Sequence, residues 1–287
     1  EIRAIGSHGQ TVRHRPDGPS PFTLQIADPN IIAERSGITT VADFRRRDMA
    51  AGGQAAPLVP AFHAACFRNI EEDRAVLNLG GIANLTILPA DPQHPITGFD
   101  TGPANVLMDG WIAGHNGKTF DADGAWAASG QTIPTLLKRF LSDSFLHAPP
   151  PKSTGRERFN ANWLELQLGD ESFAAVDVQA TLADFTAQSV AAALKSWAPA
   201  TRRLLVCGGG AHNGHLLSIL RTLLTGVEIE STAAQGLDPD WVEAAAFAWM
   251  AKETLAGRPS NSPSVTGAHG ATILGGVYLA RGWACGR

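Results

Sequence analysis

Residues 76–105 read VLNLGGIANLTILPADPQHPITGFDTGPAN, and this stretch determines the predicted fold. Residues 76–88 form two apolar runs of strand type, separated by the turn Gly80-Gly81, and residues 96–99 supply a third strand. Asp100 follows at the predicted end of that strand, just ahead of a glycine turn. A carboxylate held there by a sheet is suited to act as a general base beside a phosphate group.

Asp100 also has a purely structural interpretation. Pro103 is predicted to be the first residue of a helix over 104–113, because its missing N–H and fixed φ cost nothing at that position. Asp100 could then cap this helix. Thr101 or Gly102 could cap it instead, which would leave the carboxylate free for chemistry.

A second glycine turn follows an apolar strand in the other half of the chain. Residues 203–207 read RLLVC and precede Gly208-Gly209-Gly210, with helices predicted around 182–197 and over 216–224. This order predicts a crossover layout with helices covering a sheet. The turn would let backbone amides approach an anion or a nucleobase, or it would serve only close packing. The Walker A pattern is absent from the sequence.

The remaining elements are predicted from periodicity and from turn residues. The predicted strands are 1–14, interrupted by a turn at 6–10, then 24–26 and 38–41; the helices are 29–35, 58–67 and 134–145; the loops are 49–57 and 149–155. A last helix is predicted to begin at Asp238-Pro239, with Trp241 and Trp249 on its apolar face.

Composition limits the class of protein. The 287 residues are 44% hydrophobic and 17% charged, which is ordinary for a globular α/β chain with a substantial core. A net charge of −4 and the single short basic run at 45–47, bracketed by acids, give no basic surface of the kind that binds nucleic acid. The run is interpreted as a solvated turn for at least two of its three arginines. No apolar run reaches the length of a membrane span. Cys66, Cys207 and Cys285 fit neither a disulfide framework nor a zinc pattern, which favours a reducing cytoplasm.

The histidines show no spacing typical of a metal site. His8 lies between glycines and is followed by Gln10 and Thr11, a polar cluster that could donate hydrogen bonds to a hydroxylated ligand. A histidine whose ring makes its hydrogen bonds within the turn would explain the same pattern.

Seven segments, in the correct order, resemble the 1,6-anhydro-N-acetylmuramic acid kinases of the sugar kinase, Hsp70 and actin superfamily. They are GSHGQTV at 6–12, FRRRDMAAGGQAAPLVP at 44–60, NLGGIANLT at 78–86, GFDTGPAN at 98–105, PPKSTGRERFN at 150–160, CGGGAHN at 207–213 and DPDWVEAAAFAW at 238–249. They run nearly from end to end of the chain, so the resemblance is specific.

The resemblance implies an α/β, two-lobed, actin-like ATPase fold with ribonuclease H-like sheets. Residues 1–97 would form the first lobe and 98–287 the second, with the last helix packing back on the first. The family's phosphate-binding hairpin, of the type GxMSGTSxDGxD, is expected ahead of Glu1. The implied reaction opens the 1,6-anhydro bond with water and phosphorylates O6 with ATP. Its product is N-acetylmuramic acid 6-phosphate, in bacterial peptidoglycan recycling.

The resemblance also implies roles for individual residues. Asp100 would be the catalytic base that activates water. The adenosine side of the cleft would be formed by Gly208, Gly209, Gly210 and Asn213. The sugar or its lactyl carboxylate would be held by His8, Gly9, Gln10, Thr11, Arg45, Asp48, Asn84 and Glu243.

ATP and Mg²⁺ are the implied cofactors, with no Mg²⁺ ligand assigned. The expected partners are a small amino sugar and ATP, without nucleic acid or membrane, in the cytoplasm; a homodimer is left open. Two other functions fit the same residues: a non-catalytic nucleotide- or muropeptide-binding module, and another sugar kinase of the same superfamily.

Overall fold

The computed structural model describes residues 2–281, and the chain divides into two compact units. Within the described residues, unit 1 comprises 2–67, 95–97 and 241–281, and unit 2 comprises 68–94 and 98–240. The boundary predicted at residue 97 does not follow these units. Residues 68–94 lie in unit 2 because their strand at 74–79 pairs with the strand at 203–207. The last long helix lies in unit 1 because it packs on the first strand.

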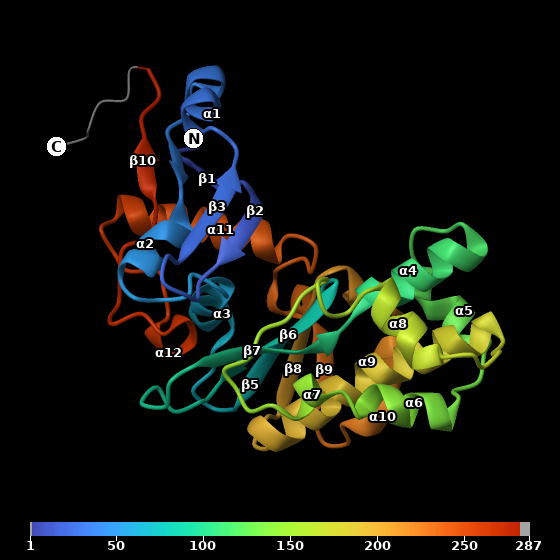
Figure 1. Ribbon diagram of the computed structural model, residues 1–287. Coiled ribbons are helices and arrows are strands. Elements are labelled where there is room, and N and C mark those ends of the chain that lie inside the picture. The colour runs from blue at the N-terminus through green and yellow to red at the C-terminus, as the bar shows by residue number, and fades with distance from the viewer. Residues whose placement is uncertain (1, 282–287) are drawn as a thin grey trace. The chain divides into compact units, whose positions relative to one another are not determined.

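Unit 2 is built on a five-stranded sheet with the order β7-β6-β5-β8-β9 (Figure 1). Its strands are β5 (Arg74–Leu79), β6 (Ile82–Leu88), β7 (Thr97–Pro103), β8 (Arg203–Cys207) and β9 (Glu228–Ser231). β5 pairs with β6 in antiparallel fashion around the Gly80-Gly81 turn, whereas β5–β8 and β8–β9 are parallel. Parallel pairing requires crossover connections, and helices supply them here. The predicted α/β class and crossover layout are confirmed.

The core of unit 2 is organised by one long helix. The unit's helices are α4 (Asn105–Asn116), α5 (Ala125–Ala128), α6 (Pro134–Leu141), α7 (Ser144–His147), α8 (Ala161–Leu168), α9 (Ala175–Trp197) and α10 (Gly214–Leu223), with short 3₁₀ turns at Ala122–Gly124, Gly209–His212 and Thr232–Gln235. α9 contacts α4, α5, α6 and α10. Phe185 and Leu182 on α9 are almost fully buried, and the Phe185 ring stacks on Trp163 of α8 with centroids 5.7 Å apart. Burial of such side chains is the main source of stability for this unit.

Unit 1 contains two small sheets and five helices among its described residues. β1 (Ile5–Ser7) pairs in parallel with β4 (Thr40–Ala42), and β10 (Gly276–Tyr278) pairs with β4 in antiparallel fashion. β2 (Gln10–Arg15) and β3 (Phe22–Ile26) form a separate hairpin. The helices are α1 (Pro29–Ser36), α2 (Phe44–Ala50), α3 (Val59–Phe67), α11 (Val242–Leu255) and α12 (Pro263–Thr266). The glycine at position 6 of β1 allows α11 to pack closely on this strand. A Cβ at Gly6 would come within 2.2 Å of the Phe247 carbonyl oxygen.

Two predictions around Asp100 are wrong. β7 continues through Asp100 to Pro103, so Asp100 lies within the strand and not at its end. Its backbone N–H donates to the Lys152 carbonyl at 3.1 Å, which extends the pairing on that side of the strand. Pro103 ends β7, and α4 begins two residues later at Asn105. The turn Gly80-Gly81 causes this shift, because its carbonyls accept the backbone N–H groups of residues 104–106.

Two helix predictions also need correction. The run at 45–47 belongs to α2 and is not a turn, although Arg46 and Arg47 are exposed as expected. The helix predicted over 134–145 is divided into α6 and α7. Asp143 causes the division, because its side chain accepts the Phe145 N–H and caps α7 instead of continuing a helix.

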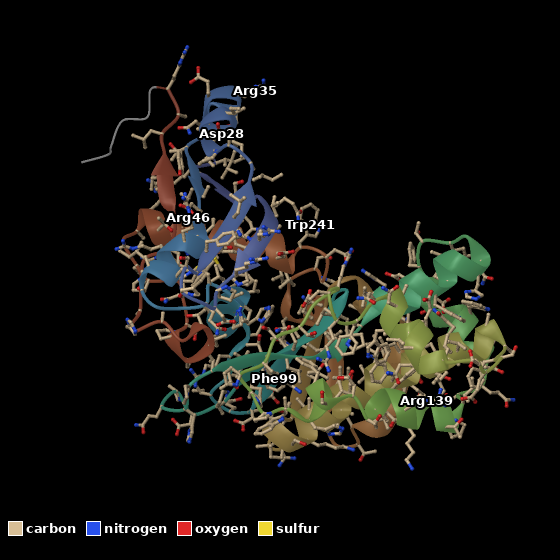
Figure 2. The ribbon with its side chains drawn as sticks, viewed as in Figure 1. Asp28, Arg35, Arg46, Phe99, Arg139 and Trp241 are labelled. Carbon is tan, nitrogen blue, oxygen red and sulfur yellow. The ribbon has the colours of Figure 1, made fainter. Side chains whose placement is uncertain are left out.

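The start of the last long helix also differs from the prediction. α11 begins at Val242 and not at Pro239, because the Asp238 side chain accepts the Asp240 N–H in a preceding turn. Trp241 therefore precedes the apolar face of the helix and is 64% exposed, contrary to the prediction that it is core (Figure 2). Trp249 is partly buried against the unit 1 core, as predicted.

Among residues 2–281, no helix is both long enough and apolar enough to cross a membrane. Cys285 lies outside the described residues; Cys66 is an exposed free thiol, and Cys207 is buried.

Candidate active site

The Asp100 carboxylate in unit 2 is held by two hydrogen-bond donors. Asn84, on the neighbouring strand β6, donates its side-chain N–H to Asp100 Oδ1 at 2.9 Å. The backbone N–H of Thr154 donates to Asp100 Oδ2 at 2.8 Å. Since the Gly80-Gly81 carbonyls cap α4, Asp100 makes no capping bond to that helix. The structure thus excludes the capping interpretation and leaves a positioned carboxylate.

The environment of Asp100 raises the pKa of its carboxyl group. Burial raises the pKa of this carboxyl, the hydrogen bonds from Asn84 and Thr154 lower it, and the charge of Glu157 raises it further. Burial dominates, so the pKa of Asp100 lies above its ordinary value. A base of raised pKa binds a proton more strongly than a solvent-exposed aspartate does, which suits it to take a proton from water near neutral pH.

The loop predicted at 149–155 lies directly against this carboxylate. Lys152 anchors the loop by donating from Nζ to the carbonyls of Phe145 and Leu146, at 3.0 and 2.9 Å. The positive charge of Lys152 also lowers the pKa of Asp100. Sequence reasoning assigned no role to Thr154, although it lies in one of the family-like segments. Its contribution is a backbone N–H, which leaves no signal in residue identity.

The three glycines after β8 serve two different purposes. A side chain at Gly208, where φ is +77°, would come within 2.4 Å of Asn78 Oδ1, and one at Gly210 would come within 2.5 Å of Leu79 Cβ. Both positions are therefore pressed against the end of β5 and need glycine for packing. A Cβ at Gly209 would meet nothing closer than Asn105 Nδ2, at 3.9 Å. Gly209 is the glycine whose backbone faces open space.

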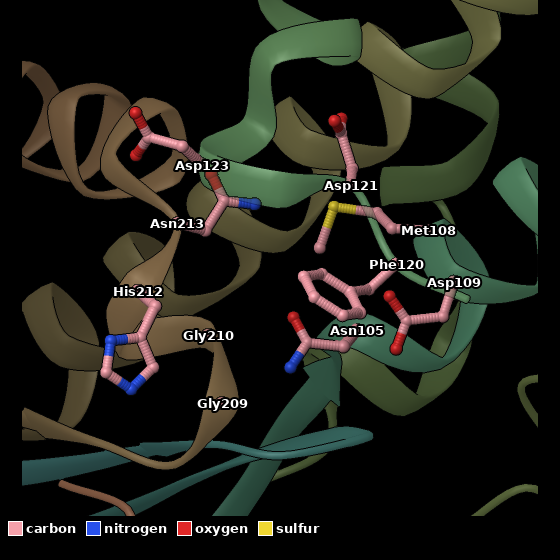
Figure 3. Close-up of a pocket in the computed structure, with 10 residues that line it drawn as sticks. All are labelled: Asn105, Met108, Asp109, Phe120, Asp121, Asp123, Gly209, Gly210, His212 and Asn213. Atoms are coloured by element: carbon pink, nitrogen blue, oxygen red, sulfur yellow. The ribbon is translucent and has the colours of Figure 1, made fainter. Parts of the chain in front are cut away.

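A cavity of about 390 Å³ opens at this turn, entirely within unit 2 (Figure 3). Its lining comes from α4, the 3₁₀ turn after β8 and the segment at 120–123: Asn105, Met108, Asp109, Phe120, Asp121, Asp123, Gly209, Gly210, His212 and Asn213. The volume lies in the range of small-molecule sites and is sufficient for a purine nucleoside. Three of the four predicted adenosine-side residues line this cavity; Gly208 does not.

Asn213 is oriented by its role at the start of α10. Its Oδ1 accepts the Leu216 N–H at 2.9 Å, and the side chain is pressed against Gly124, where a Cβ would come within 2.3 Å of the same oxygen. Since Oδ1 is engaged, the amide group that remains is Nδ2, which points toward the cavity in Figure 3. Asn213 therefore offers a hydrogen-bond donor to a ligand.

Sequence reasoning missed most of the cavity wall. The sequence predicts Asn105 only as part of a helix, and it indicates no functional role for Asp109, Phe120, Asp121 and Asp123. The helical spacing of Asn105 and Asp109, four positions apart on α4, was the available signal, since such residues share a helix face. The acids at 121 and 123 reach the cavity only through tertiary packing.

Unit 1 contains a second polar cluster, built from His8, Arg45 and Glu243. The Arg45 Nε–H donates to His8 Nε2 at 2.8 Å, and its NH1 donates to the Ala55 carbonyl at 2.6 Å. Glu243 lies exposed in the first turn of α11, and its charge raises the pKa of Arg45 against the larger lowering by burial. The structure thus brings together three residues that are far apart in the sequence.

His8 is kept neutral by these neighbours. An arginine only donates, so His8 Nε2 accepts, and the ring proton resides on Nδ1. Burial, together with the charge of Arg45, lowers the pKa of His8 to about 4, against a small opposing effect of the Gly9 backbone. The ring also stacks on Phe247, with centroids 4.5 Å apart. His8 is therefore a fixed neutral hydrogen-bonding group near neutral pH.

Asp48 is fully buried beneath this region. Its carboxylate accepts hydrogen bonds from the Ala55 N–H, Asn261 Nδ2 and Thr266 Oγ1, each at 2.8 to 2.9 Å. A Cβ at Gly53 would come within 2.2 Å of Asp48 Oδ2, which explains the glycine at this position of the predicted loop. With no exposed surface, Asp48 fixes the loop that carries Ala55 and does not itself reach a ligand in this structure.

The remaining predicted sugar residues lie at the start of the β2–β3 hairpin. Gly9 has φ +71°, and a Cβ there would come within 2.6 Å of the Ile26 carbonyl oxygen. Thr11 Oγ1 accepts from Gln25 Nε2 at 3.1 Å, whereas Gln10 is exposed. These residues shape the hairpin, and Gln10 keeps a free side-chain carbonyl oxygen.

The described residues contain no group of three or more His, Cys, Asp or Glu side chains that could hold a metal ion. Mg²⁺ typically binds through one or two carboxylates together with substrate phosphates and water. A Mg²⁺ site therefore does not require such a group, and no Mg²⁺ ligand is assigned.

Comparison with known proteins gives a consistent result. A family model described as anhydro-N-acetylmuramic acid kinase matches residues 1–280. The anhydro-N-acetylmuramic acid kinase of Xanthomonas axonopodis pv. citri (strain 306) is 58% identical over 280 residues, which are 98% of this chain and 74% of that protein. The kinase of the same name from Coxiella burnetii (strain Dugway 5J108-111) is 54% identical over 277 residues, 96% of this chain and 74% of that protein.

Among solved structures, xylulose kinase from Rhodospirillum rubrum aligns with 16% identity and a TM-score of 0.39, over 66% of this chain and 41% of that chain. A likeness at this level supports no inference about the present chain.

The different surroundings of two neighbouring glycines give a stability prediction. Gly210→Ala should lower the free energy of unfolding by about 1–3 kcal/mol, because the new methyl group would overlap Leu79. Gly209→Ala is the matched control and should change it by less than about 0.5 kcal/mol, the usual effect of a substitution that clashes with nothing. Denaturant unfolding of both variants checks this; equal losses would contradict the packing argument.

The low pKa of His8 gives a pH prediction. The ring proton signals of His8 in NMR should not titrate between about pH 5 and 8, since its pKa is lowered to about 4. Because the unfolded chain binds this proton more readily, stability contributed by neutral His8 is present above about pH 6.5 and is lost as the pH falls toward 4. A titration midpoint near 6.5 in the folded protein would contradict the Arg45–His8 geometry.

Proposed function

The chain belongs to the anhydro-N-acetylmuramic acid kinase family, and from this premise we propose that it opens 1,6-anhydro-N-acetylmuramic acid with water and phosphorylates O6. The product is N-acetylmuramic acid 6-phosphate, and the metabolic setting is peptidoglycan recycling. The observation that carries the proposal is the Asp100 carboxylate, held by Asn84 and Thr154 and not used for capping.

Asp100 acts as the general base in this proposal. It takes a proton from water while the water oxygen forms a bond to the anomeric carbon, and the bond from that carbon to O6 breaks. The electron pair of the broken bond stays on O6, which thereby becomes the phosphoryl acceptor. Asn84 and the Thr154 N–H keep the carboxylate oriented, so that its free lone pairs face the water.

The cavity beside Gly209 is the proposed nucleotide site. The exposed backbone at Gly209 and the Asn213 Nδ2 donor suit the adenosine part, and Met108 and Phe120 supply apolar wall. When bound, ATP would supply the phosphoryl group that O6 receives; the bond that joins the γ-phosphorus to the rest of ATP would break and ADP would leave. We propose that Mg²⁺ enters with the nucleotide phosphates, in keeping with its preference for such ligands.

The cluster in unit 1 is the proposed sugar site. Neutral His8 and exposed Gln10 are suited to hydroxyl and amide groups, and Arg45 supplies a cation for the lactyl carboxylate. Gly9 and Thr11 shape the β2–β3 hairpin, which begins at Gln10, two residues after His8. Glu243 is the exposed acid of this cluster. Asp48 fixes the loop whose Ala55 carbonyl accepts a hydrogen bond from Arg45.

Cytoplasmic localisation is part of the proposal, since the exposed free thiol of Cys66 suits a reducing compartment. A homodimer remains a proposal that measurement of the mass in solution would test.

Asp100→Asn should abolish the reaction without unfolding the protein. The amide preserves the size of the side chain but cannot take a proton, and the loss of a general base costs about 100- to 10,000-fold in kcat. ADP release that depends on the anhydro-sugar is the measurement, with exposed Asp170→Asn as a matched control of unchanged activity and thermal unfolding as a check of the fold.

Retention of most of the activity by Asp100→Asn would refute the assignment of the base. Sugar binding by calorimetry without any ADP release from the unmodified protein would instead favour the non-catalytic binding module. A simple hexose that competes successfully with the anhydro-sugar would favour a different sugar kinase.

The raised pKa of Asp100 predicts the acid limb of the pH profile. kcat should fall as the pH decreases through a value above that of an ordinary aspartate, about 4, because protonation removes the base. Asn84→Ala removes a hydrogen bond that stabilises the carboxylate, so the limb should move to higher pH. Asn116→Ala, exposed at the end of α4, is the control. An unshifted limb in Asn84→Ala would contradict this interpretation.

A further inference from the structure

Three carboxylates line the cavity of unit 2, and two of them accept hydrogen bonds from backbone N–H groups of the protein. Asp121 accepts the backbone N–H groups of Trp126 and Ala127, each at 2.9 Å, and so fixes the start of α5. Asp123 accepts the Gly214 N–H at 2.8 Å, at the first residue of α10. Both side chains have a structural task that accounts for their presence.

Asp109 is the exception. It lies half-buried in the second turn of α4, and within residues 2–281 no hydrogen bond reaches its carboxylate. Burial raises the pKa of Asp109 to about 6; the charge of Arg156 lowers it, and that of Asp121 raises it further. A partly desolvated carboxylate without donors is unfavourable in the free protein, and a ligand that brings donors relieves that cost.

The chemistry of the cavity limits what such a ligand offers to Asp109. A carboxylate repels phosphate oxygens, so the charged end of a nucleotide does not lie against it. The neighbouring Met108 and Phe120 are suited to an uncharged, flat group. In Figure 3 the Asp109 carboxylate lies across the cavity from Gly209, Gly210 and Asn213. The groups that fit this place are neutral N–H or O–H donors on a nucleoside.

Resting on the proposed function, we propose that Asp109 selects the nucleotide by accepting a hydrogen bond from a neutral donor of adenosine, either a ribose hydroxyl or the 6-amino group of adenine. Both groups are neutral hydrogen-bond donors, and nucleotide analogues that lack one or the other show which of them contacts Asp109. Asn105 lies one turn earlier on the same face of α4 and is held by its bond from Nδ2 to the Leu79 carbonyl at 2.9 Å. Among the three carboxylates of this wall, Asp109 is thus the one that accepts no hydrogen bond from the described residues.

The test combines variants with nucleotide analogues. Asp109→Ala should raise the KM for ATP by about 10- to 100-fold at saturating sugar, with kcat nearly unchanged, as expected for one hydrogen bond to a charged group. The analogues are 2′-deoxy-ATP, 3′-deoxy-ATP and the triphosphate of purine riboside, which lacks the amino group. The analogue that lacks the contacted donor should be penalised in the unmodified protein and not in Asp109→Ala.

Asp109→Asn retains one acceptor oxygen and should recover part of the affinity. Exposed Asp170→Ala removes the same charge elsewhere in unit 2 and should leave the KM for ATP unchanged. Calorimetric titration with ADP and the corresponding diphosphates gives the same comparison without turnover, so it tests Asp109 even if the proposed kinase reaction fails.

Equal analogue penalties in the unmodified protein and in both Asp109 variants, for all three analogues, would overturn the proposal. The proposed function fails on a different result, the absence of sugar-dependent ADP release from the unmodified protein.

Discussion

Unit 2 depends on the turn Gly80-Gly81 and the carbonyl groups it presents. These carbonyls accept the first backbone N–H groups of α4, so the helix needs no side-chain cap. The Asp100 carboxylate is thereby released from the capping role that its position in the sequence would allow. It is bound instead by Asn84 from β6 and by the Thr154 N–H. A backbone interaction, available because two glycines form the turn, thus leaves this carboxylate free for the catalytic role that we propose.

The same turn sets the position of the cavity wall. Because α4 starts at Asn105, the side chains of Asn105, Met108 and Asp109 face the glycine turn that follows β8. Gly208 and Gly210 bring that turn tightly against β5, while Gly209 stays open. Close packing and ligand access, two alternatives for a triple glycine, are therefore both present and are divided among the three residues.

His8 in unit 1, and Asp100 and Asp109 in unit 2, are partly buried ionisable groups whose pKa values are shifted by their surroundings. Arg45 donates to His8 and keeps the imidazole neutral, with its pKa lowered to about 4. Burial acts in the opposite direction on carboxyl groups, raising the pKa of Asp100 and that of Asp109. In each case desolvation is the largest cause, and neighbouring donors or charges adjust it. The chemistry we propose follows from these environments more than from residue type.

The sequence alone determined the α/β class, the strand pairs around Gly80-Gly81, the strand at 203–207 and the family, because apolar periodicity and glycine turns are local signals. Ordered motifs along the chain identified Asp100 and Asn84 as candidates, although not that they contact each other. The exact limits of β7, the exposure of Trp241 and the free state of Asp109 depend on which groups meet in space. Only the tertiary structure decided these, since hydrogen-bond partners from distant segments, such as Thr154 with Asp100 and Gly214 with Asp123, leave no pattern in a linear sequence.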